Sequence, residues 1–265
     1  MAFLELADGN ISYETSGVSD GSVLIFCHSL GANRHLWDRQ IALFEGFYKI
    51  VRLDLRGHGQ SDVFTTPYSI EMLAKDVLHL LDHLDIQRCS LIGLSLGSMI
   101  GLWLAAHEPH RFNQMVLAGA SASVQKSAPF DQRIAKIQKY GLDSMFDELN
   151  ERWYNPKFVA NNLDVVNSVR KMVNATAKAG YIAATMAVRN FDITGKLSQI
   201  DTEILLITGA EDKATPIAEA RTIAANCTNS KLFVIENASH LAIVEKPESF
   251  DTAMVNFINK MPLPA

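Results

Sequence analysis

The residues best suited to do chemistry lie in the run Gly93-Leu94-Ser95-Leu96-Gly97. An apolar stretch, residues 89–92, precedes this run and a helical pattern follows it, which is the strand-turn-helix context of a nucleophile elbow. The serine of so sharp a turn has a strained backbone, and side chains at Gly93 or Gly97 would collide with the neighbouring helix and strand. Ser95 would then lie at a helix N-terminus, where backbone N–H groups favour developing negative charge.

A serine hydroxyl is a weak nucleophile and needs a general base that a third group holds in place. In folds with this turn, the acid and then the histidine follow the serine along the chain. Asp212 lies in the loop after one apolar run, and His240 lies in the loop after the next. Glu211 is the alternative acid, but the spacing to Pro216 favours Asp212. We therefore predict a catalytic triad of Ser95, His240 and Asp212.

Two backbone N–H groups would form the oxyanion hole of this triad. One belongs to Leu96, directly after the nucleophile, and the other to Leu30, in the loop after the apolar run 23–27. Each such donor is worth roughly 2.7–4 kcal/mol. Ser95 would attack an ester or lactone carbonyl while its proton passes to His240, and water activated by the same histidine would then release the acyl group.

The surrounding pattern predicts an α/β fold. Short unbroken apolar runs, such as residues 115–118 and 204–207, suit strands that are buried on both faces of a parallel sheet. Helical patterns lie between these runs, with apolar residues on one face of the stretch 70–84. The chain starts with two strand patterns, residues 3–7 and 10–15, which form a hairpin. We expect a mostly parallel twisted sheet flanked by helices.

Residues 122–196 break this alternation, because they contain helical patterns and no strand run. We interpret them as a helical cap, or lid, inserted over the carboxyl edge of the sheet. The core domain would then consist of residues 1–121 and 197–265. The helical patterns of the cap cover residues 134–140, 143–154, 163–177 and 180–189.

Composition excludes several classes of protein. A formal net charge of −5 with no basic cluster argues against binding to nucleic acid. The three cysteines, Cys27, Cys89 and Cys227, match no zinc or redox spacing, so we expect reduced thiols, no metal and no cofactor. The N-terminus has no signal-peptide pattern and no stretch is long and apolar enough for a membrane span, so we expect a cytoplasmic protein. Nothing in the sequence indicates an oligomeric state.

The chain resembles the α/β-hydrolase superfamily from end to end, and within it the 3-oxoadipate enol-lactonases of the β-ketoadipate route of aromatic catabolism. The run Asp54–Asp62 is common across the superfamily. The closer resemblance lies in Gly93–Pro109, Glu151–Tyr154, Gly180–Asp192 and Ser239–Glu248. It implies that Ser95, Asp212 and His240 occupy catalytic positions and that the substrate is 3-oxoadipate enol-lactone, which is hydrolysed to 3-oxoadipate without a cofactor.

Two positions depart from the lactonase pattern. The lactonases usually have Asn-Ser-Leu-Gly at the oxyanion loop, whereas this chain has His28-Ser29-Leu30-Gly31. They also have a second glycine after the elbow, where this chain has Ser98. We expect His28 to hydrogen-bond the backbone and shape the loop. These departures concern the choice of substrate and not the hydrolase chemistry.

A small lactone that bears a carboxylate needs a cation in its pocket, because burying an unpaired anion is costly. Arg152 and Arg189 in the cap and Arg34 beside the oxyanion loop are the candidates. Ser29 and Trp153 are expected to line the same pocket.

Other functions share the same catalytic residues. A general carboxylesterase, a C–C bond hydrolase and a cofactor-free perhydrolase or haloperoxidase would all use this triad. A dehalogenase is disfavoured, because it needs aspartate at position 95. A function of a different class is a ligand receptor that keeps the hydrolase fold and turns over slowly.

Overall fold

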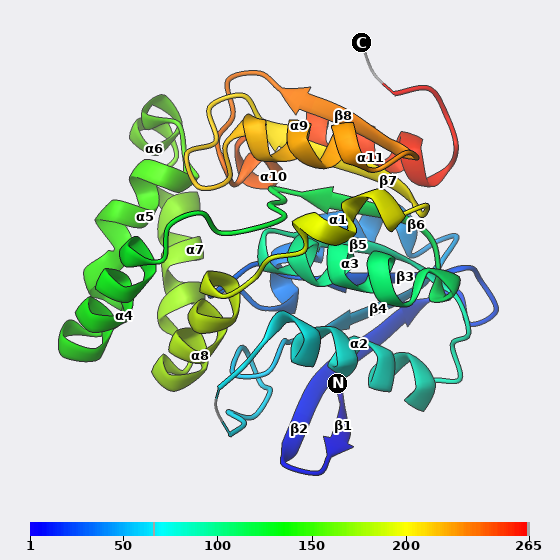
Figure 1. Ribbon diagram of the computed structural model, residues 1–265, viewed down its shortest axis with the longest axis horizontal. Coiled ribbons are helices and arrows are strands. Elements are labelled where there is room, and N and C mark those ends of the chain that lie inside the picture. The colour runs from blue at the N-terminus through cyan, green and yellow to red at the C-terminus, as the bar shows by residue number, and fades with distance from the viewer. Residues whose placement is uncertain (66, 264–265) are drawn as a thin grey trace.

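The computed structural model describes residues 1–65 and 67–263, and its centre is one eight-stranded sheet (Figure 1). The strand order is β1-β2-β4-β3-β5-β6-β7-β8. The pairs β1–β2 and β2–β4 are antiparallel and the other pairs are parallel. The strands are β1 (Ala2–Leu6), β2 (Gly9–Gly17), β3 (Val23–Cys27), β4 (Lys49–Leu53), β5 (Cys89–Leu94), β6 (Phe112–Ala118), β7 (Glu203–Gly209) and β8 (Ser230–Ile235).

The buried residues of the sheet lie in the continuous apolar runs from which the sequence predicts its strands. Every residue of the central strand β5 is buried, and so are nearly all residues of β6 and β7. Continuous apolar runs are needed here because helices cover both faces of the parallel part of the sheet. The edge strand β8 is only partly buried.

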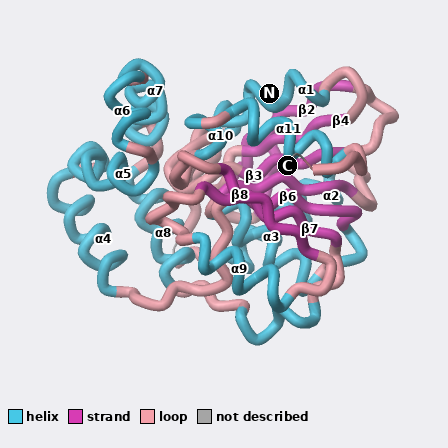
Figure 2. The backbone as a smooth tube through the Cα atoms, turned by 90° about the horizontal axis from the view of Figure 1, so that it is seen from above, coloured by secondary structure: helices cyan, strands magenta, loops and turns pink. Residues whose placement is uncertain are grey.

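Helices of the core pack on the two faces of the sheet (Figure 2). Side chains of α2, α3 and α9 belong to one apolar cluster, and those of α1 and α11 belong to the other. The core helices are α1 (Asp38–Phe44), α2 (Ile70–His83), α3 (Leu96–His107), α9 (Ile217–Asn226), α10 (Ala242–Glu245) and α11 (Pro247–Ile258). In the part of the chain that the structure describes, no helix has the length and apolar character to cross a bilayer.

Five further helices lie between β6 and β7 in the chain and group together beside the sheet (Figure 1). They fall in the segment in which the sequence predicts the cap, and α6 is an addition to the predicted helical patterns. A side-chain cap from Asn155 and a proline at the first position start this short helix. The cap helices are α4 (Ala128–Tyr140), α5 (Phe146–Trp153), α6 (Pro156–Asn161), α7 (Leu163–Asn174) and α8 (Lys178–Arg189).

The chain leaves the sheet for the cap helices and returns from them at one place. Ser123 and Asp192 form an isolated antiparallel bridge. On either side of it, the Val124 N–H donates to the Phe191 carbonyl at 3.2 Å and the Ile193 N–H donates to the Ala122 carbonyl at 2.8 Å. These bonds fasten the two ends of the inserted segment to each other.

Gly97 shows how closely α3 approaches the strands beneath it. A Cβ atom on Gly97 would lie 2.1 Å from the carbonyl oxygen of Cys27, at the end of β3. A Cβ atom on Gly93 would lie 2.5 Å from the carbonyl oxygen of Gly97. The collisions expected from the sequence are therefore confirmed, and both involve backbone, which cannot move aside as a side chain can.

We expect Gly97→Ala to lower the free energy of unfolding by about 3 kcal/mol, because the new methyl group displaces α3 from β3. The matched control is Gly195→Ala, since a Cβ atom at Gly195 meets nothing within 4 Å. Thermal and denaturant unfolding of both variants checks this. Equal stabilities of the two variants would contradict the close approach.

Candidate active site

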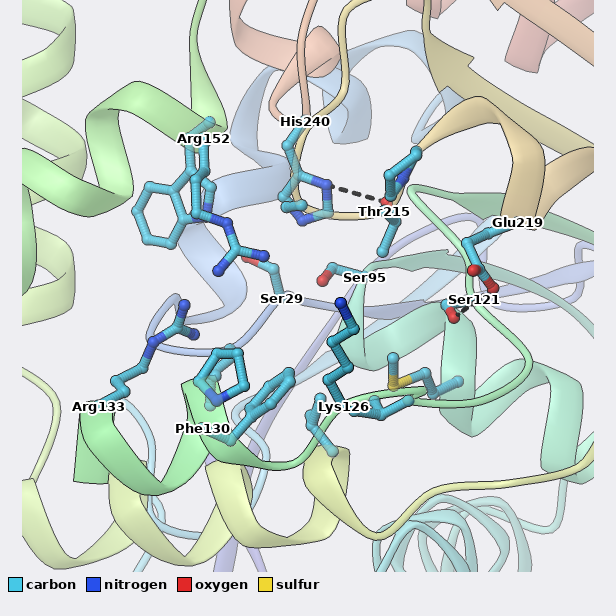
Figure 3. A pocket seen from close by; sticks show the side chains of 18 of the residues that line it. Ser29, Ser95, Ser121, Lys126, Phe130, Arg133, Arg152, Thr215, Glu219 and His240 are labelled. Carbon is cyan, nitrogen blue, oxygen red and sulfur yellow. Dashed lines mark hydrogen bonds between the residues drawn. The ribbon is translucent and has the colours of Figure 1, made fainter. Parts of the chain in front are cut away.

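Ser95 lies in the sharp turn between β5 and α3, with φ +54° and ψ −105°. A residue with a side chain rarely adopts a positive φ, so the conformation is strained and the surrounding structure must hold it. The Ser95 N–H donates to the Ala118 carbonyl at 2.8 Å, which ties the turn to the end of β6. The turn presents the hydroxyl group to a pocket (Figure 3).

Asp212 and His240 form a buried hydrogen-bonded pair. The loop after β7 holds Asp212, and the loop after β8 holds His240, so both lie at the carboxyl edge of the sheet. The Nδ1 atom of His240 is 2.8 Å from Oδ2 of Asp212. Since a carboxylate only accepts hydrogen bonds, Nδ1 must have the proton. The Nε2 atom is therefore left as a proton acceptor, and the imidazole faces the same pocket as Ser95 (Figure 3).

Further donors fix the Asp212 carboxylate. The N–H groups of Ala214 and Thr215 donate to Oδ1 at 2.7 and 2.8 Å, and the Thr215 hydroxyl donates to Oδ2 at 2.8 Å. Burial alone raises the pKa of Asp212, but His240 and these donors outweigh it, so the pKa lies below its ordinary value. Asp212 is therefore ionised at neutral pH and holds the imidazole in one orientation.

Glu211, the alternative acid, points elsewhere. Its Oε2 atom accepts a hydrogen bond from the side chain of Asn155 at 2.7 Å. It is exposed, and among the described residues its carboxylate makes no hydrogen bond or ion pair with His240.

The two predicted oxyanion donors lie on either side of the turn. Leu96 is the first residue of α3, so its N–H has no partner within the helix. Leu30 follows β3 and lines the pocket beside Ser95. Both groups are placed at the edge of the sheet where the strands β3 and β5 end side by side.

His28 shapes the loop that contains Leu30, as expected from its position. Its Nδ1–H donates to the Ser29 carbonyl at 2.8 Å, and its Nε2 accepts the Leu55 N–H at 2.9 Å. Both ring nitrogens are therefore used with the imidazole neutral. Burial lowers the pKa of His28 to about 4, which keeps it neutral at neutral pH.

Ser98, the second departure from the lactonase pattern, is also buried and bonded. Its hydroxyl oxygen is 2.7 Å from the Ala118 carbonyl and 2.9 Å from the Gly93 carbonyl. It therefore joins the turn to the neighbouring strand and does not reach the pocket, whose lining does not include it.

The pocket has a volume of about 460 Å³. Ser95 and His240 of the core line it, and the remaining walls come partly from other loops of the core and partly from the inserted segment, including the cap helices α4, α5 and α8 (Figure 3). Ser29 and Trp153, the two residues expected to line the pocket, do so, and so do Leu30, the predicted oxyanion donor, and Arg152, one of the three candidate cations.

Two arginines of the cap helices reach into one side of the pocket. Figure 3 shows Arg133, from α4, and Arg152, from α5, on the same side of Ser95. In the described chain the Arg152 guanidinium makes no hydrogen bond or ion pair. The Arg133 guanidinium lies 3.9 Å from the Glu148 carboxylate, while its buried Nε and the buried hydroxyl of Tyr181 have no hydrogen-bond partner. Burial, and then the neighbouring Arg133, lower the pKa of Arg152. Arg152 therefore brings to the pocket a guanidinium that no carboxylate of the described chain pairs with.

Arg34 and Arg189 were predicted as substrate contacts, and neither lines the pocket. Arg34 is buried elsewhere, and its backbone N–H donates to the Asp54 carboxylate at 2.8 Å while its guanidinium pairs with the same group. The Nε atom of Arg189 is 3.0 Å from Asp131 on α4. Each of these arginines is therefore engaged by a carboxylate of the chain itself.

Arg133 was missed by the sequence analysis, although a signal existed. The buried residues of α4 are Arg133 and Ile137, four residues apart and so on one face of the helix. A charged residue on the apolar face of a helix is unusual and points to a functional contact. Tyr181 gave no such signal, because tyrosine is common in buried helices.

Hydrogen bonds attach the cap helices to the loop of His240. The Leu241 N–H donates to the Trp153 carbonyl at 3.0 Å. The Ser239 hydroxyl donates to the Arg152 carbonyl, also at 3.0 Å. Both neighbours of His240 are thus bound to the residues that line the side of the pocket with the two arginines.

Glu245 strengthens this attachment. Its Oε1 accepts the N–H of Asn155 at 2.6 Å, and its Oε2 accepts the N–H of Ser239 at 2.5 Å. Burial raises the pKa of Glu245, and the two N–H groups offset this in part. One carboxylate therefore bridges the end of α5 and the loop that contains His240.

Comparison with known proteins identifies the family of the fold. A model of the alpha/beta hydrolase fold matches residues 22–247. 3-Oxoadipate enol-lactonase 2 of Acinetobacter baylyi is 34% identical over 251 residues, which cover 95% of this chain and 94% of the relative. 3-Oxoadipate enol-lactonase 1 of the same organism is 29% identical with the same coverage.

Solved structures give the same result. A hydrolase from Pseudomonas aeruginosa PA01 superposes with a TM-score of 0.93 at 34% identity and covers 97% of each chain. The enol-lactonase from Burkholderia xenovorans LB400 superposes with a TM-score of 0.94 at 26% identity, covering 97% of this chain and 100% of that one.

Two buried neutral histidines should destabilise the fold in acid. Burial lowers the pKa of His28 to about 4 and that of His58 to about 3, whereas histidines of an unfolded chain titrate near 6.5. Below about pH 6.5 the unfolded chain binds protons that the folded protein does not, so the free energy of unfolding falls as pH falls. When the pH is lowered from about 8 to about 5, each of the two histidines should reduce the free energy of unfolding by about 2 kcal/mol.

His28→Asn tests this, because an asparagine amide also offers a donor and an acceptor to the loop. Denaturant unfolding at about pH 8 and about pH 5 measures the free energy of unfolding of both proteins. On acidification this free energy should fall by about 2 kcal/mol less in the variant than in the wild type. An equal loss in both proteins would show that His28 does not remain neutral in the folded state.

Proposed function

Since the chain belongs to the alpha/beta hydrolase fold family, we propose that it hydrolyses carboxylic esters with Ser95 as nucleophile, His240 as general base and Asp212 as the group that orients the histidine. The family match confirms the fold and the resemblance expected from the sequence. The hydrogen-bonded pair of Asp212 and His240 beside the strained serine is what supports this assignment of roles.

The reaction begins with attack of the Ser95 hydroxyl on the carbonyl carbon of the ester. The proton passes to Nε2 of His240, and the imidazolium that forms is stabilised by the ionised carboxylate of Asp212. The carbonyl oxygen becomes an oxyanion, for which the N–H groups of Leu30 and Leu96 are the donors. Collapse of this intermediate breaks the ester C–O bond, and the imidazolium gives its proton to the leaving oxygen.

The second half of the reaction releases the acyl group from Ser95. His240 removes a proton from water, and the hydroxide attacks the acyl carbon. When the serine C–O bond breaks, the proton returns from the imidazolium to Ser95. In a lactone the leaving oxygen is part of the same molecule, so one open-chain acid leaves the pocket at this stage.

The substrate that the pocket fits best is a lactone with a carboxylate, and we propose 3-oxoadipate enol-lactone, an intermediate of aromatic catabolism. The observation that carries this choice is the unpaired Arg152 guanidinium, with Arg133 and the Tyr181 hydroxyl beside it. A carboxylate bound there would satisfy donors that the described chain leaves unused, and an esterase for neutral substrates would not need them. The similarity to two 3-oxoadipate enol-lactonases supports the same choice.

We expect Ser95→Ala to reduce kcat for this lactone by a factor on the order of 10⁵, because the nucleophile of a triad acts as a unit with its base. A fluorophosphonate should label the wild type at Ser95 and leave the variant unlabelled, as mass spectrometry of the intact protein would show. A wild-type protein that neither turns over p-nitrophenyl acetate nor becomes labelled would leave only the non-enzymatic alternative, a ligand receptor.

We expect Arg152→Ala to raise KM for the carboxylated lactone by about 10–100-fold, as a charge-assisted hydrogen bond is lost. KM for neutral p-nitrophenyl acetate should change far less. Arg189→Ala is the matched control, because Arg189 lies on the neighbouring α8 but pairs with Asp131 outside the pocket. Equal effects of Arg152→Ala on both substrates, measured by steady-state kinetics, would count against the anion site.

A further inference from the structure

The side of the pocket opposite the two arginines has polar groups that hydrolysis of a small lactone does not use. Figure 3 shows Ser121 and Glu219 across Ser95 from Arg133 and Arg152. Ser121 follows β6, and Glu219 lies in the first turn of α9, so the core and not the cap helices supplies this side. The pocket is therefore polar at two ends, with the nucleophile between them.

The volume of the pocket leaves room for a group at this second end. About 460 Å³ is within the range of roughly 300–1,000 Å³ that encloses drug-sized ligands. An enol-lactone with one short carboxylate arm has few atoms and reaches from Ser95 to the arginines. Such a ligand does not need the polar groups of Ser121 and Glu219, which line the same pocket.

Glu219 is held as a hydrogen-bond acceptor. The Ser121 hydroxyl is buried and lies 3.0 Å from Oε2 of Glu219 and 2.7 Å from the Ser123 carbonyl, so its single hydrogen is shared between these two acceptors. In the described chain Oε1 of Glu219 has no hydrogen-bond partner, and the carboxylate forms no ion pair. The position near the N-terminus of α9 favours its negative charge.

We propose that Ser121 and Glu219 form a second substrate subsite, which binds a hydroxyl or amide N–H group located across the scissile carbonyl from the substrate carboxylate. This deepens the proposed function and rests on it. The substrate class is then a carboxylated ester or lactone with an additional hydrogen-bond donor. Glu219 accepts the hydrogen bond, and Ser121 positions Glu219.

Charge favours a neutral donor at this subsite over a cation. The exposed side chain of Lys126 extends toward the same part of the pocket from the start of the cap (Figure 3). It would repel an ammonium group of the substrate. A ligand without a donor would displace water from the Glu219 carboxylate without replacing the hydrogen bond of that water. Sites that hydrogen-bond a substrate O–H or N–H group discriminate strongly against analogues that lack this group.

Three monoesters of succinate provide the test, because each presents the same carboxylate to the arginines. The 2-hydroxyethyl ester has a donor in the alcohol part. The propyl ester has the same size without the oxygen, and the 2-methoxyethyl ester has the oxygen without its hydrogen. The wild type should hydrolyse the 2-hydroxyethyl ester with a kcat/KM about 10-fold higher than either of the others.

Variants assign this selectivity to the subsite. The selectivity is the ratio of kcat/KM for the 2-hydroxyethyl ester to kcat/KM for the propyl ester. Glu219→Leu removes the acceptor at similar size and should bring this ratio to about one. Glu219→Gln keeps an acceptor and should retain several-fold selectivity. Ser121→Ala should lower the ratio in part, because Glu219 loses its positioning contact. Glu236→Gln is the control, since Glu236 is an exposed carboxylate outside the pocket and should leave the ratio unchanged.

Binding to the Ser95→Ala variant separates this proposal from the hydrolase proposal. Calorimetry should show about 10-fold tighter binding of the 2-hydroxyethyl ester than of the propyl ester, whatever the rate of hydrolysis. Hydrolysis of all three esters at one kcat/KM, with equal binding, would overturn the subsite and leave the hydrolase function standing. Retained binding selectivity without any Ser95-dependent turnover would overturn the hydrolase function instead.

Discussion

The left-handed backbone of Ser95 is the constraint on which the rest of the site depends. A residue with a side chain keeps a φ of +54° only if the structure around it leaves no alternative. Here α3 lies so close to β3 that position 97 has no room even for a methyl group, and Ser98 joins the turn to β6. This packing also brings the ends of β3 and β5 together. The Ser95 hydroxyl and the two N–H groups proposed as oxyanion donors are thereby held by one arrangement of backbone.

The residues that the sequence predicts well are those whose positions follow from backbone topology. Asp212 follows β7 and His240 follows β8, and parallel strands end at the same edge of the sheet, so the sequence pattern predicts that the two side chains meet. The partners of arginines are different, because a long side chain reaches whatever anion the tertiary structure places nearby. Arg34 meets Asp54 in the interior, whereas Arg152 meets no anion at all in the described chain. Such outcomes depend on helix packing and not on local pattern.

Substrate recognition and proton transfer are joined by the hydrogen bonds around His240. The carboxylate of Glu245 holds the end of α5 and the histidine loop together, and both neighbours of His240 bind the backbone of residues 152–153. A displacement of this part of the cap would therefore displace the imidazole of His240 as well. The end of α5 and the loop of His240 are thus one hydrogen-bonded unit.

The paired ends of the inserted segment have a consequence for how such a protein diversifies. The chain departs from β6 and returns toward β7 through backbone hydrogen bonds between residues 122–124 and 191–193. The core therefore meets the insertion at two places, this closed neck and the bonds that residues 152–155 make to the loop of His240. A change of specificity that keeps the reaction intact must preserve both places. The parts of the inserted helices that bear neither connection are where the chain is free to vary.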